Sequence, residues 1–261
     1  IHPDARLAPG VTVEPFTTIA ADVEIGEGTW IGPNVAIMNG ARIGQHCQVF
    51  PGAVIGAVPQ DLKFAGEQTT AVIGDYTVIR ECVTVNRGTV DRGETRVGSH
   101  CLLMAYVHIA HDCSIGHHCI LANTVQVAGH VEIGDYAIVG GSSAVHQFVK
   151  IGAHAMISGG SLVRKDVPPF VKAGREPLSY AGANSVGLRR RGFSEESINI
   201  VQQLYRTLFW GGLNNNDALA QIELELPVSP ERDIAVGFIR AATRGIIKGP
   251  KRGRPDGSEA E

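Results

Sequence analysis

The stretch VGSHCLLMAYVHIAHDCSIGHHCILANTVQV, residues 97–127, has an aliphatic residue at every sixth position. The same frame extends back to Ile1 and forward to Val163, and it places 25 aliphatic residues in phase. A small or β-branched residue follows four positions after nearly every one of them. Glycine, asparagine and aspartate cluster in between, where tight turns need them.

A period of six fits neither of the common secondary structures. Alternation every two residues indicates a half-buried strand, and a spacing of 3.6 indicates a helix. A period of six is typical of a hexapeptide β-solenoid, in which each hexad is a short strand plus a turn and three hexads close a triangular coil of about 18 residues. Successive coils stack at about 4.8 Å. The sequence therefore predicts a mainly β fold in which residues 18 apart are neighbours.

Composition changes along the chain predict its domain organisation. The solenoid is expected over 1–168, with polar insertions at 61–72 and 86–96. A Pro/Gly-rich extended connection, an α-helical C-terminal domain and a flexible tail are expected at 169–192, 193–248 and 249–261.

Capping signals predict three helices in the C-terminal domain. Ser194 is a suitable N-cap for the first, followed by acidic residues in its first turn. The second is expected to start near Asn216, and the third at Ser229 and Pro230, a cap followed by proline.

Charge and cysteine content exclude several classes of protein. The formal net charge of −3 gives no reason to expect a nucleic-acid partner. No apolar run approaches the roughly 18 residues of a membrane helix, and the first residues lack a signal-peptide layout. Five cysteines spread singly argue against a disulfide framework. We expect a soluble, cytoplasmic protein with no integral membrane segment and reduced thiols.

The segment HIAHDCSIGHHC, residues 108–119, has the composition of a zinc site. Cys113 and Cys119 nevertheless fall at the fifth hexad position, which points into the core, so we expect them to be buried as small apolar residues. His117 and His118 fall at a corner and are expected to be solvated. His108, His111 and Asp112 are expected on the outer surface of the coil, where they can take part in chemistry.

Stacking of the coils gathers polar residues in a column at one corner. Gly129 lies one coil above His111, and His130 lies one coil above Asp112. The expected column contains His111, Asp112, Gly129, His130, His146 and Gln147. A neutral imidazole beside a carboxylate is a competent general base, and glycine lets a substrate carbonyl approach a backbone N–H. No serine elbow or exposed thiol suggests a covalent nucleophile, so direct transfer is the simpler scheme.

Several motifs resemble one family throughout the chain to about residue 247. They are IGAVPQDLKFAGE, NRGT, LLMAYVHIAHDC, AGHVEIGD, AVHQF, KDVPPF and GLRRRGFS. In this order they are similar to the UDP-N-acetylglucosamine O-acyltransferases, hexapeptide-repeat enzymes of the first step of lipid A biosynthesis in Gram-negative bacteria. The resemblance implies a left-handed parallel β-helix and a homotrimer with active sites between subunits. It also implies transfer of a 3-hydroxyacyl chain from acyl carrier protein to the 3-hydroxyl of UDP-N-acetylglucosamine, without a cofactor.

The same resemblance implies roles for individual residues. His111 would be the base, Asp112 its partner and Gly129 the oxyanion donor. The residues that would hold the sugar and the acyl donor are Gln60, Asp61, Lys63, His108, His130 and His146. Those that would bind the nucleotide are Gln147, Asn184, Arg190 and Arg191, of which the arginines suit phosphate.

Two further expectations concern substrate specificity. Gly159 would leave the solenoid wall bare, permitting an acyl chain of about 14 carbons or more, to which each buried methylene adds about 0.8 kcal/mol at most. A tight turn would equally explain this glycine. Val186 departs from the family, where we expect an acidic nucleotide contact.

Two alternative functions stay open at this point. Gamma-class carbonic anhydrases use the same solenoid and bind zinc through three histidines, and four histidines gather at this corner. The QDLKF insertion, the arginine triplet 189–191 and the helical C-terminus argue against that reading, so we predict no metal. A non-catalytic β-helix would not need a clustered His/Asp column.

Overall fold

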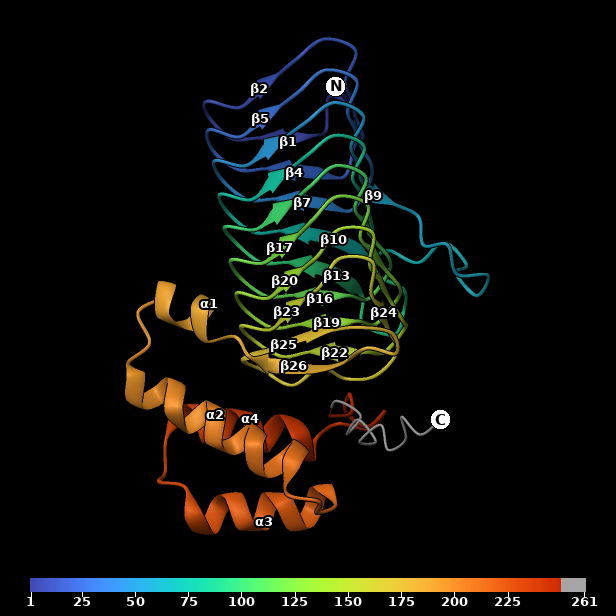
Figure 1. The fold of residues 1–261 in the computed structure, drawn as a ribbon. Helices are drawn as coiled ribbons and strands as arrows, with labels where there is room; N and C mark the ends of the chain where they lie inside the picture. The colour runs from blue at the N-terminus through green and yellow to red at the C-terminus, as the bar shows by residue number, and fades with distance from the viewer. Residues whose placement is uncertain (250–261) are drawn as a thin grey trace, which may run out of the picture.

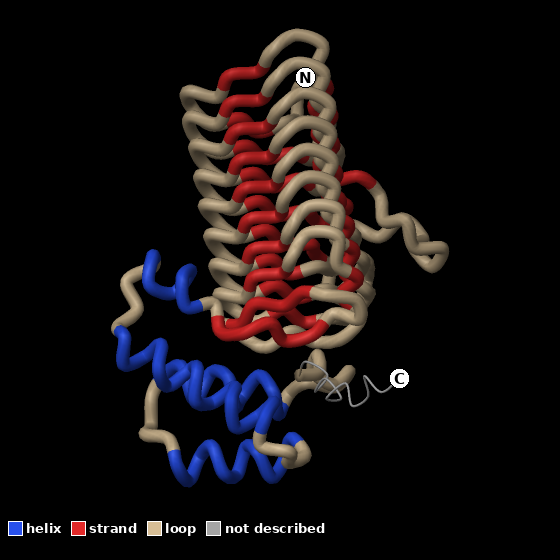
Figure 2. Tube along the Cα trace, in the orientation of Figure 1, coloured by secondary structure: helices blue, strands red, loops and turns tan. Residues whose placement is uncertain are grey.

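The computed structural model describes residues 1–249, which form a three-sided β-helix followed by helices. Figure 1 shows the stacked coils, and Figure 2 shows the short strands separated by turns on each side. The three walls, here called sheets A, B and C, are parallel and each receives every third strand up to β24 (Leu162–Val163); β25 (Val171–Gly174) and the antiparallel β26 (Ser179–Ala183) then extend sheet B. The predicted fold class is confirmed.

The strands of the sheets have the following bounds. Sheet A contains β1 (Arg6–Leu7), β4 (Val23–Ile25), β7 (Ala41–Ile43), β10 (Thr70–Ile73), β13 (Glu94–Val97), β16 (Ser114–Ile115), β19 (Glu132–Ile133) and β22 (Lys150–Ile151). Sheet B contains β2 (Thr12–Val13), β5 (Trp30–Ile31), β8 (Gln48–Val49), β11 (Val78–Ile79), β14 (Leu102–Leu103), β17 (Ile120–Leu121), β20 (Ile138–Val139), β23 (Met156–Ile157), β25 (Val171–Gly174) and β26 (Ser179–Ala183). Sheet C contains β3 (Thr18–Ile19), β6 (Ala36–Ile37), β9 (Val54–Ala57), β12 (Thr84–Asn86), β15 (His108–Ile109), β18 (Gln126–Val127), β21 (Ala144–Val145) and β24 (Leu162–Val163).

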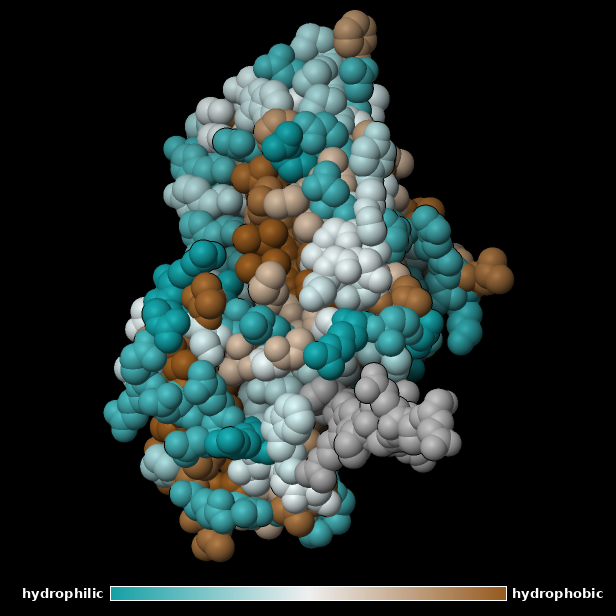
Figure 3. All heavy atoms as spheres, viewed as in Figure 1, coloured by the Kyte–Doolittle hydropathy of each residue, from teal (hydrophilic) through white to brown (hydrophobic). Residues whose placement is uncertain are grey.

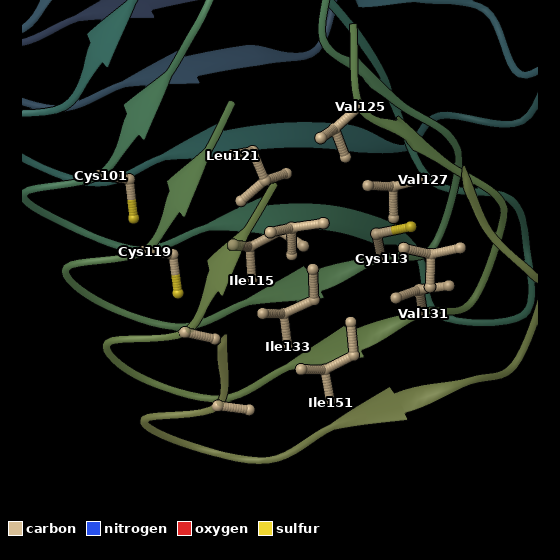
Figure 4. Close-up of a cluster of buried hydrophobic side chains, with 14 of the residues drawn as sticks. Cys101, Cys113, Ile115, Cys119, Leu121, Val125, Val127, Val131, Ile133 and Ile151 are labelled. Carbon is tan, nitrogen blue, oxygen red and sulfur yellow. The ribbon is translucent and has the colours of Figure 1, made fainter. Parts of the chain in front are cut away.

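The aliphatic residue of each hexad fills the interior. Ile109 pairs in register with Val127, 18 residues later, and both are 0% exposed. Cys113 and Cys119 point into this core as predicted, at 2% and 0% exposure (Figure 4). Burial raises the pKa of the Cys113 thiol to about 12, so this thiol stays protonated at pH 7.

The outward faces of the three sheets differ in character. Sheet A is charged, with ion pairs such as Glu132–Lys150 between adjacent strands. Sheet C carries mostly small or polar residues, including Thr84 and His108, with Val54 and Leu162 as apolar exceptions. Sheet B carries a continuous aliphatic ladder, Val78, Leu102, Ile120, Ile138 and Met156, in which each residue pairs with the next. Figure 3 shows apolar atoms gathered over these strands.

Turns between sheets form three corner columns, which we name AB, BC and CA after the sheets they join. Corner AB carries a ladder of stacked rings: His46, Tyr76, His100, His118, Tyr136, His154 and Phe170, with centroids 4.6 to 5.6 Å apart. His118 is therefore part of this stack and only partly solvated, whereas His117 is exposed as expected.

Both insertions leave the helix at corner CA, but their bounds differ from those expected. The first connects β9 to β10 over residues 58–69, and the second connects β12 to β13 over 87–93. Residues such as Thr70–Val72 and Glu94–Arg96, which we expected in the insertions, belong to strands of sheet A. Polar side chains that face outward on this sheet do not interrupt the pairing of its strands. Figure 1 shows the first insertion projecting away from the coils.

The segment expected as an extended connection is more ordered than predicted. Strand β25 continues sheet B beyond residue 168, and β26 pairs with it in antiparallel fashion. The helices are α1 (Ser185–Arg190), α2 (Glu195–Trp210), α3 (Asn215–Glu225) and α4 (Pro230–Arg240). The side chains of Ser194, Asn214 and Ser229 cap α2, α3 and α4.

The predicted tail lies outside the described residues apart from Gly249. Within residues 1–249, we find no helix with the length and apolar character needed to cross a bilayer.

Candidate active site

The candidate active site lies at corner CA, in the turn that joins β15 to β16. His111 and Asp112 occupy this turn, and Nδ1 of His111 lies 2.8 Å from Oδ2 of Asp112. His111 is 8% exposed and Asp112 is 0% exposed. We expected both on the open surface, but the second insertion folds back over them. The result is a largely desolvated His–Asp pair.

The surroundings of Asp112 determine its charge. Burial acts to raise the pKa of this carboxyl, but hydrogen bonds from Thr89 and His111 outweigh burial and hold the pKa below its ordinary value. An ionised carboxylate only accepts hydrogen bonds, so Nδ1 of a neutral His111 must donate to it. The lone pair of His111 is then on Nε2, the form that a general base requires.

Gly129 supports the imidazole of His111 from the next coil. A Cβ atom at this position would lie 2.7 Å from both Cε1 and Nε2 of His111, so a larger residue would displace the ring. The backbone N–H of Gly129 takes part in no hydrogen bond among residues 1–249. This glycine therefore allows close packing of the base and leaves a backbone donor available beside it.

His130 is held on both sides of its ring. Its Nε2 lies 3.6 Å from Oδ2 of Asp112, and its Nδ1 lies 3.3 Å from Oδ2 of Asp91. Its ring meets His111 edge-on at 5.1 Å and stacks on Phe148 at 4.6 Å. The predicted column of Asp112 and His130 is thus present, with Phe148 as its third level.

The other predicted histidines lie nearby on sheet C. His108 faces outward from β15, and its Nδ1 lies 2.7 Å from Oγ1 of Thr84. Burial and the nearby His111 lower the pKa of His108, so it is neutral at pH 7. His146 follows β21 and is exposed, with Nδ1 3.0 Å from the carbonyl oxygen of Gln147.

The sugar-binding candidates Gln60, Asp61 and Lys63 lie in the first insertion. Gln60 and Lys63 are exposed, and the backbone N–H of Lys63 donates to Oδ1 of Asp61 at 2.9 Å. Within residues 1–249, no hydrogen bond or ion pair joins the three to His111. Corner CA brings them to the same side of the molecule as the dyad without direct contact.

Three of the four nucleotide-binding candidates lie at a different corner, whereas Gln147 lies between β21 and β22 at corner CA. Asn184 is 3% exposed, donates to the carbonyl oxygen of His154 at 2.9 Å, and caps α1. Arg191 donates to the carbonyl oxygen of Tyr136 at 2.9 Å, and its guanidinium lies over that ring. Arg190 is exposed. One chain therefore places these residues at corner AB, away from His111.

Two specificity candidates also have defined positions. Gly159 lies in the turn from β23 to β24, at corner BC, and is exposed. Its φ is not left-handed, and a Cβ there would lie 3.1 Å from the carbonyl oxygen of Gly141. Val186, in the position where we expected an acidic side chain, is 56% exposed on α1.

Sequence reasoning missed the residues that surround the dyad. Thr89 and Thr95 bond directly to Asp112, and Asp91 approaches His130. Thr89 and Asp91 lie in the second insertion, outside the hexad frame, so periodicity assigns them no neighbours. Thr95 lies in β13, one coil before Cys113. The signal available in the sequence was that a polar insertion directly precedes the coil that carries His111.

His111, Asp112 and His130 also form the cluster that a metal ion could use. Their ligand atoms lie within 4.8 Å of one another. Oδ2 of Asp112 already accepts hydrogen bonds from His111 and Thr89. These contacts favour a hydrogen-bonded dyad over a metal site.

Comparison with known proteins identifies the family. Residues 166–247 match the family described as Udp N-acetylglucosamine O-acyltransferase, domain 2, and residues 22–57 and 94–129 match bacterial transferase hexapeptide repeats. A curated relative from Trichlorobacter lovleyi is named acyl-(acyl-carrier-protein)–UDP-N-acetylglucosamine O-acyltransferase. It is 51% identical over 253 residues, which cover 95% of this chain and 97% of the relative. This chain belongs to that acyltransferase family.

Solved structures agree with this assignment. LpxA from Acinetobacter baumannii matches with a TM-score of 0.92 and 44% identity, covering 95% of this chain and 97% of the other. LpxA from Bacteroides fragilis, a UDP-N-acetylglucosamine acyltransferase, matches with a TM-score of 0.83 and 46% identity over 95% of this chain and all of the other. The family confirms the predicted enzyme class and does not favour the zinc-hydratase alternative.

Proposed function

We propose that this chain transfers a 3-hydroxyacyl group from acyl carrier protein to the 3-hydroxyl of UDP-N-acetylglucosamine, the first step of lipid A biosynthesis. Nε2 of His111 removes the proton from the sugar hydroxyl as its oxygen attacks the thioester carbonyl. Asp112 stabilises the imidazolium that forms. The N–H of Gly129 donates to the oxyanion of the tetrahedral intermediate. The intermediate then expels the carrier's thiolate, which takes the proton from His111.

The observation that carries this proposal is the buried His111–Asp112 pair packed on Gly129. It supplies a base with a defined tautomer and a backbone donor in one place, without a nucleophile or cofactor. The names of the relatives supply both substrates: acyl carrier protein as donor and UDP-N-acetylglucosamine as acceptor. We also propose that the reaction takes place in the cytoplasm, as expected for a carrier-bound donor of this kind.

We further propose a homotrimer with each active site shared between two chains. The aliphatic ladder of sheet B is an apolar face whose exposure to water is unfavourable. The outward side chains of sheet C are uncharged and mostly small. Those of sheet A form solvated ion pairs. If corner BC lies near a threefold axis, sheet B of one copy packs on sheet C of the next. Corner AB of the first copy then meets corner CA of the second. Heterologous contacts of this kind close into a ring.

This arrangement would complete the site. Arg190 and Asn184 of one copy would approach His111 of its neighbour, as binding of one UDP-sugar requires. The forked guanidinium of an exposed arginine suits a diphosphate. The small residues of corner BC, Gly159 among them, would line the inner part of the cleft, where an acyl chain can be buried.

A transfer assay on the purified protein tests the proposed function. UDP-N-acetylglucosamine and a panel of 3-hydroxyacyl carrier thioesters are the substrates, and product is followed by mass spectrometry. We expect His111→Ala to lower turnover by about 10² to 10⁴, the usual effect of losing a general base. Size and circular dichroism should stay unchanged because the ring lies at corner CA and is not part of the hydrophobic core of the coils.

The matched control is His2→Ala, which removes a histidine from the first coil and should keep wild-type turnover. Retention of more than about a tenth of turnover by His111→Ala would exclude His111 as the base. Zinc analysis of the active protein separates this mechanism from the hydratase alternative.

A further inference from the structure

The turn that holds Asp112 differs from the equivalent turns above it. In a regular coil the left-handed corner residue donates its backbone N–H to a carbonyl of the coil below: His130 donates to His111 at 3.0 Å, and Phe148 donates to Gly129 at 3.2 Å. Asp112 has the same left-handed φ of 59°. Its N–H instead donates to Oγ1 of Thr95 at 2.8 Å. The second insertion replaces the turn below, so a side chain takes over the role of the missing carbonyl.

The carboxylate of Asp112 is surrounded by donors from the same insertion. Thr89 donates from its backbone N–H to Oδ1 at 3.0 Å and from its hydroxyl to Oδ2 at 2.7 Å. The backbone N–H of Arg92 lies 3.3 Å from Oδ1. Oδ2 also accepts from His111. The rotation of the carboxylate is therefore restrained at both oxygens.

Thr89 is itself held in place. It is 7% exposed, its hydroxyl accepts from the N–H of Asp91 at 3.3 Å, and its carbonyl accepts from Gly93 at 2.8 Å. The insertion is tied to the coils by Asp91, which pairs with His130, and by Arg92, which pairs with Glu132 at 2.6 Å. The threonine hydroxyl thus has one orientation available, with its hydrogen directed at Asp112.

We propose that Thr89 is a positioning residue for acyl transfer: its N–H and hydroxyl orient Asp112 so that the proton of neutral His111 stays on Nδ1 and Nε2 remains the base. This inference rests on the proposed function and adds the loop residue that sets the tautomer. The depressed pKa of Asp112, to which Thr89 contributes, agrees with this role. A carboxylate free to rotate would release the ring to the other tautomer, whose Nε2 carries a proton and cannot act as a base.

The test compares Thr89→Val, which keeps the shape and removes the hydroxyl, with Thr89→Ser, which keeps the hydroxyl. We expect Thr89→Val to lower kcat about tenfold or more, the effect of losing one hydrogen bond to a charged group, with KM for both substrates within about twofold. Thr89→Ser should stay near wild type. The control Thr29→Val removes a buried hydroxyl that bonds Gly44 in a distant coil and should leave kcat unchanged.

A second readout needs no substrate. In protein with nitrogen-15-labelled histidine, NMR should report the Nδ1–H tautomer for His111 in the wild type and in Thr89→Ser. Thr89→Val should shift His111 toward the Nε2–H tautomer. If Thr89→Val does not fold, Thr89→Ala is compared with Thr89→Ser by the same two measurements.

The results that would overturn the role of Thr89 differ from those that would overturn the proposed function. Wild-type kcat for Thr89→Val, equal losses for the valine and serine variants, or an unchanged tautomer would overturn the positioning role. A wild-type protein that transfers no acyl group would overturn the proposed function instead, and the tautomer measurement would still decide the role of Thr89.

Discussion

At the scale of single residues, the ability of a polar side chain to bind a substrate depends on whether it already forms a hydrogen bond or ion pair within the chain. The three consecutive arginines 189–191 show the difference. Arg189 pairs with Glu195, and Arg191 is anchored to Tyr136, where burial lowers the pKa of its guanidinium. Arg190 is exposed and has no ion pair among residues 1–249. It is the member of the triplet that can bind a phosphate without breaking a bond.

We therefore predict that Arg190→Met raises KM for the UDP-sugar at least tenfold, because a charge-assisted phosphate contact contributes about 1.5 to 3 kcal/mol. Arg191→Met should raise KM in the same direction and also lower the melting temperature, since it loses its anchor on Tyr136. Steady-state kinetics and calorimetry measure both. Arg189→Met is the control, and unchanged kinetics for all three variants would restrict the triplet to packing or solubility.

At the scale of elements, the hexad produces the same coil repeatedly, and departures from it carry the functional differences. Both insertions interrupt corner CA, at the two turns of this corner that precede the turn of His111. Corner BC departs in the opposite sense in its last two turns, where glycine occupies positions 140, 141, 159 and 160. A bare corner gives room on the wall of the helix, as an extended acyl chain would need.

We predict that Gly159→Met shifts the preferred acyl donor toward shorter chains, whereas the wild type prefers about 14 carbons or more, since each buried methylene contributes about 0.8 kcal/mol at most. The measurement is kcat/KM for carrier thioesters of graded length. The new Cβ would approach the carbonyl of Gly141 to 3.1 Å, so Gly159→Ala is the control for strain in the turn. Equal losses at every chain length would show damage to the turn and no role in measuring the chain.

At the scale of the whole molecule, one chain keeps the base at corner CA and the nucleotide candidates Asn184, Arg190 and Arg191 at corner AB. A shared site predicts complementation between His111→Ala and Arg190→Met, measured at low UDP-sugar concentration. Any mixed trimer would contain one intact site, so random mixing should restore about a quarter of wild-type activity. A mixture no more active than its two components, with mixed trimers verified by native mass spectrometry, would place each site within a single chain.

The aromatic ladder of corner AB predicts how stability depends on pH. Burial, followed by the charge of Arg191, lowers the pKa of His154 from 6.5 to about 4. Above pH 6.5 the imidazole of His154 is neutral in both the folded and the unfolded chain. As pH falls toward 4 the unfolded chain binds a proton that the folded chain excludes, so stability is lost over this window, by about 3 kcal/mol at most.

His154→Phe tests this prediction, because Phe170 already occupies the next level of the same stack. Melting temperatures of the variant should fall less between pH 6.5 and 4 than those of the wild type. Asp135 also lies near this ring, and His118 lies two levels away on the other side of Tyr136. Asp135→Asn is therefore measured alongside as a control. Identical pH dependence in His154→Phe and the wild type would assign the acid sensitivity to other groups.

Much of the fold and part of the site could be predicted because the number of residues per coil sets the register between coils. Ile109 and Val127 must meet once the coil contains 18 residues, and the same arithmetic stacks Gly129 on His111 and His130 on Asp112. It also directs Cys113 into the core, which removes the apparent zinc site. These results need only local periodicity and the preference of aliphatic side chains for the interior.

Tertiary structure alone decided what the period does not encode. The path of the second insertion buries the dyad, and it brings Thr89 to Asp112 from outside the repeat. The packing of α1 on corner AB engages Arg191 and leaves Arg190 exposed, although the two are adjacent in sequence. A repeated hexad specifies its neighbours through its spacing, whereas an aperiodic loop is placed by the sum of its contacts with the surface onto which it folds.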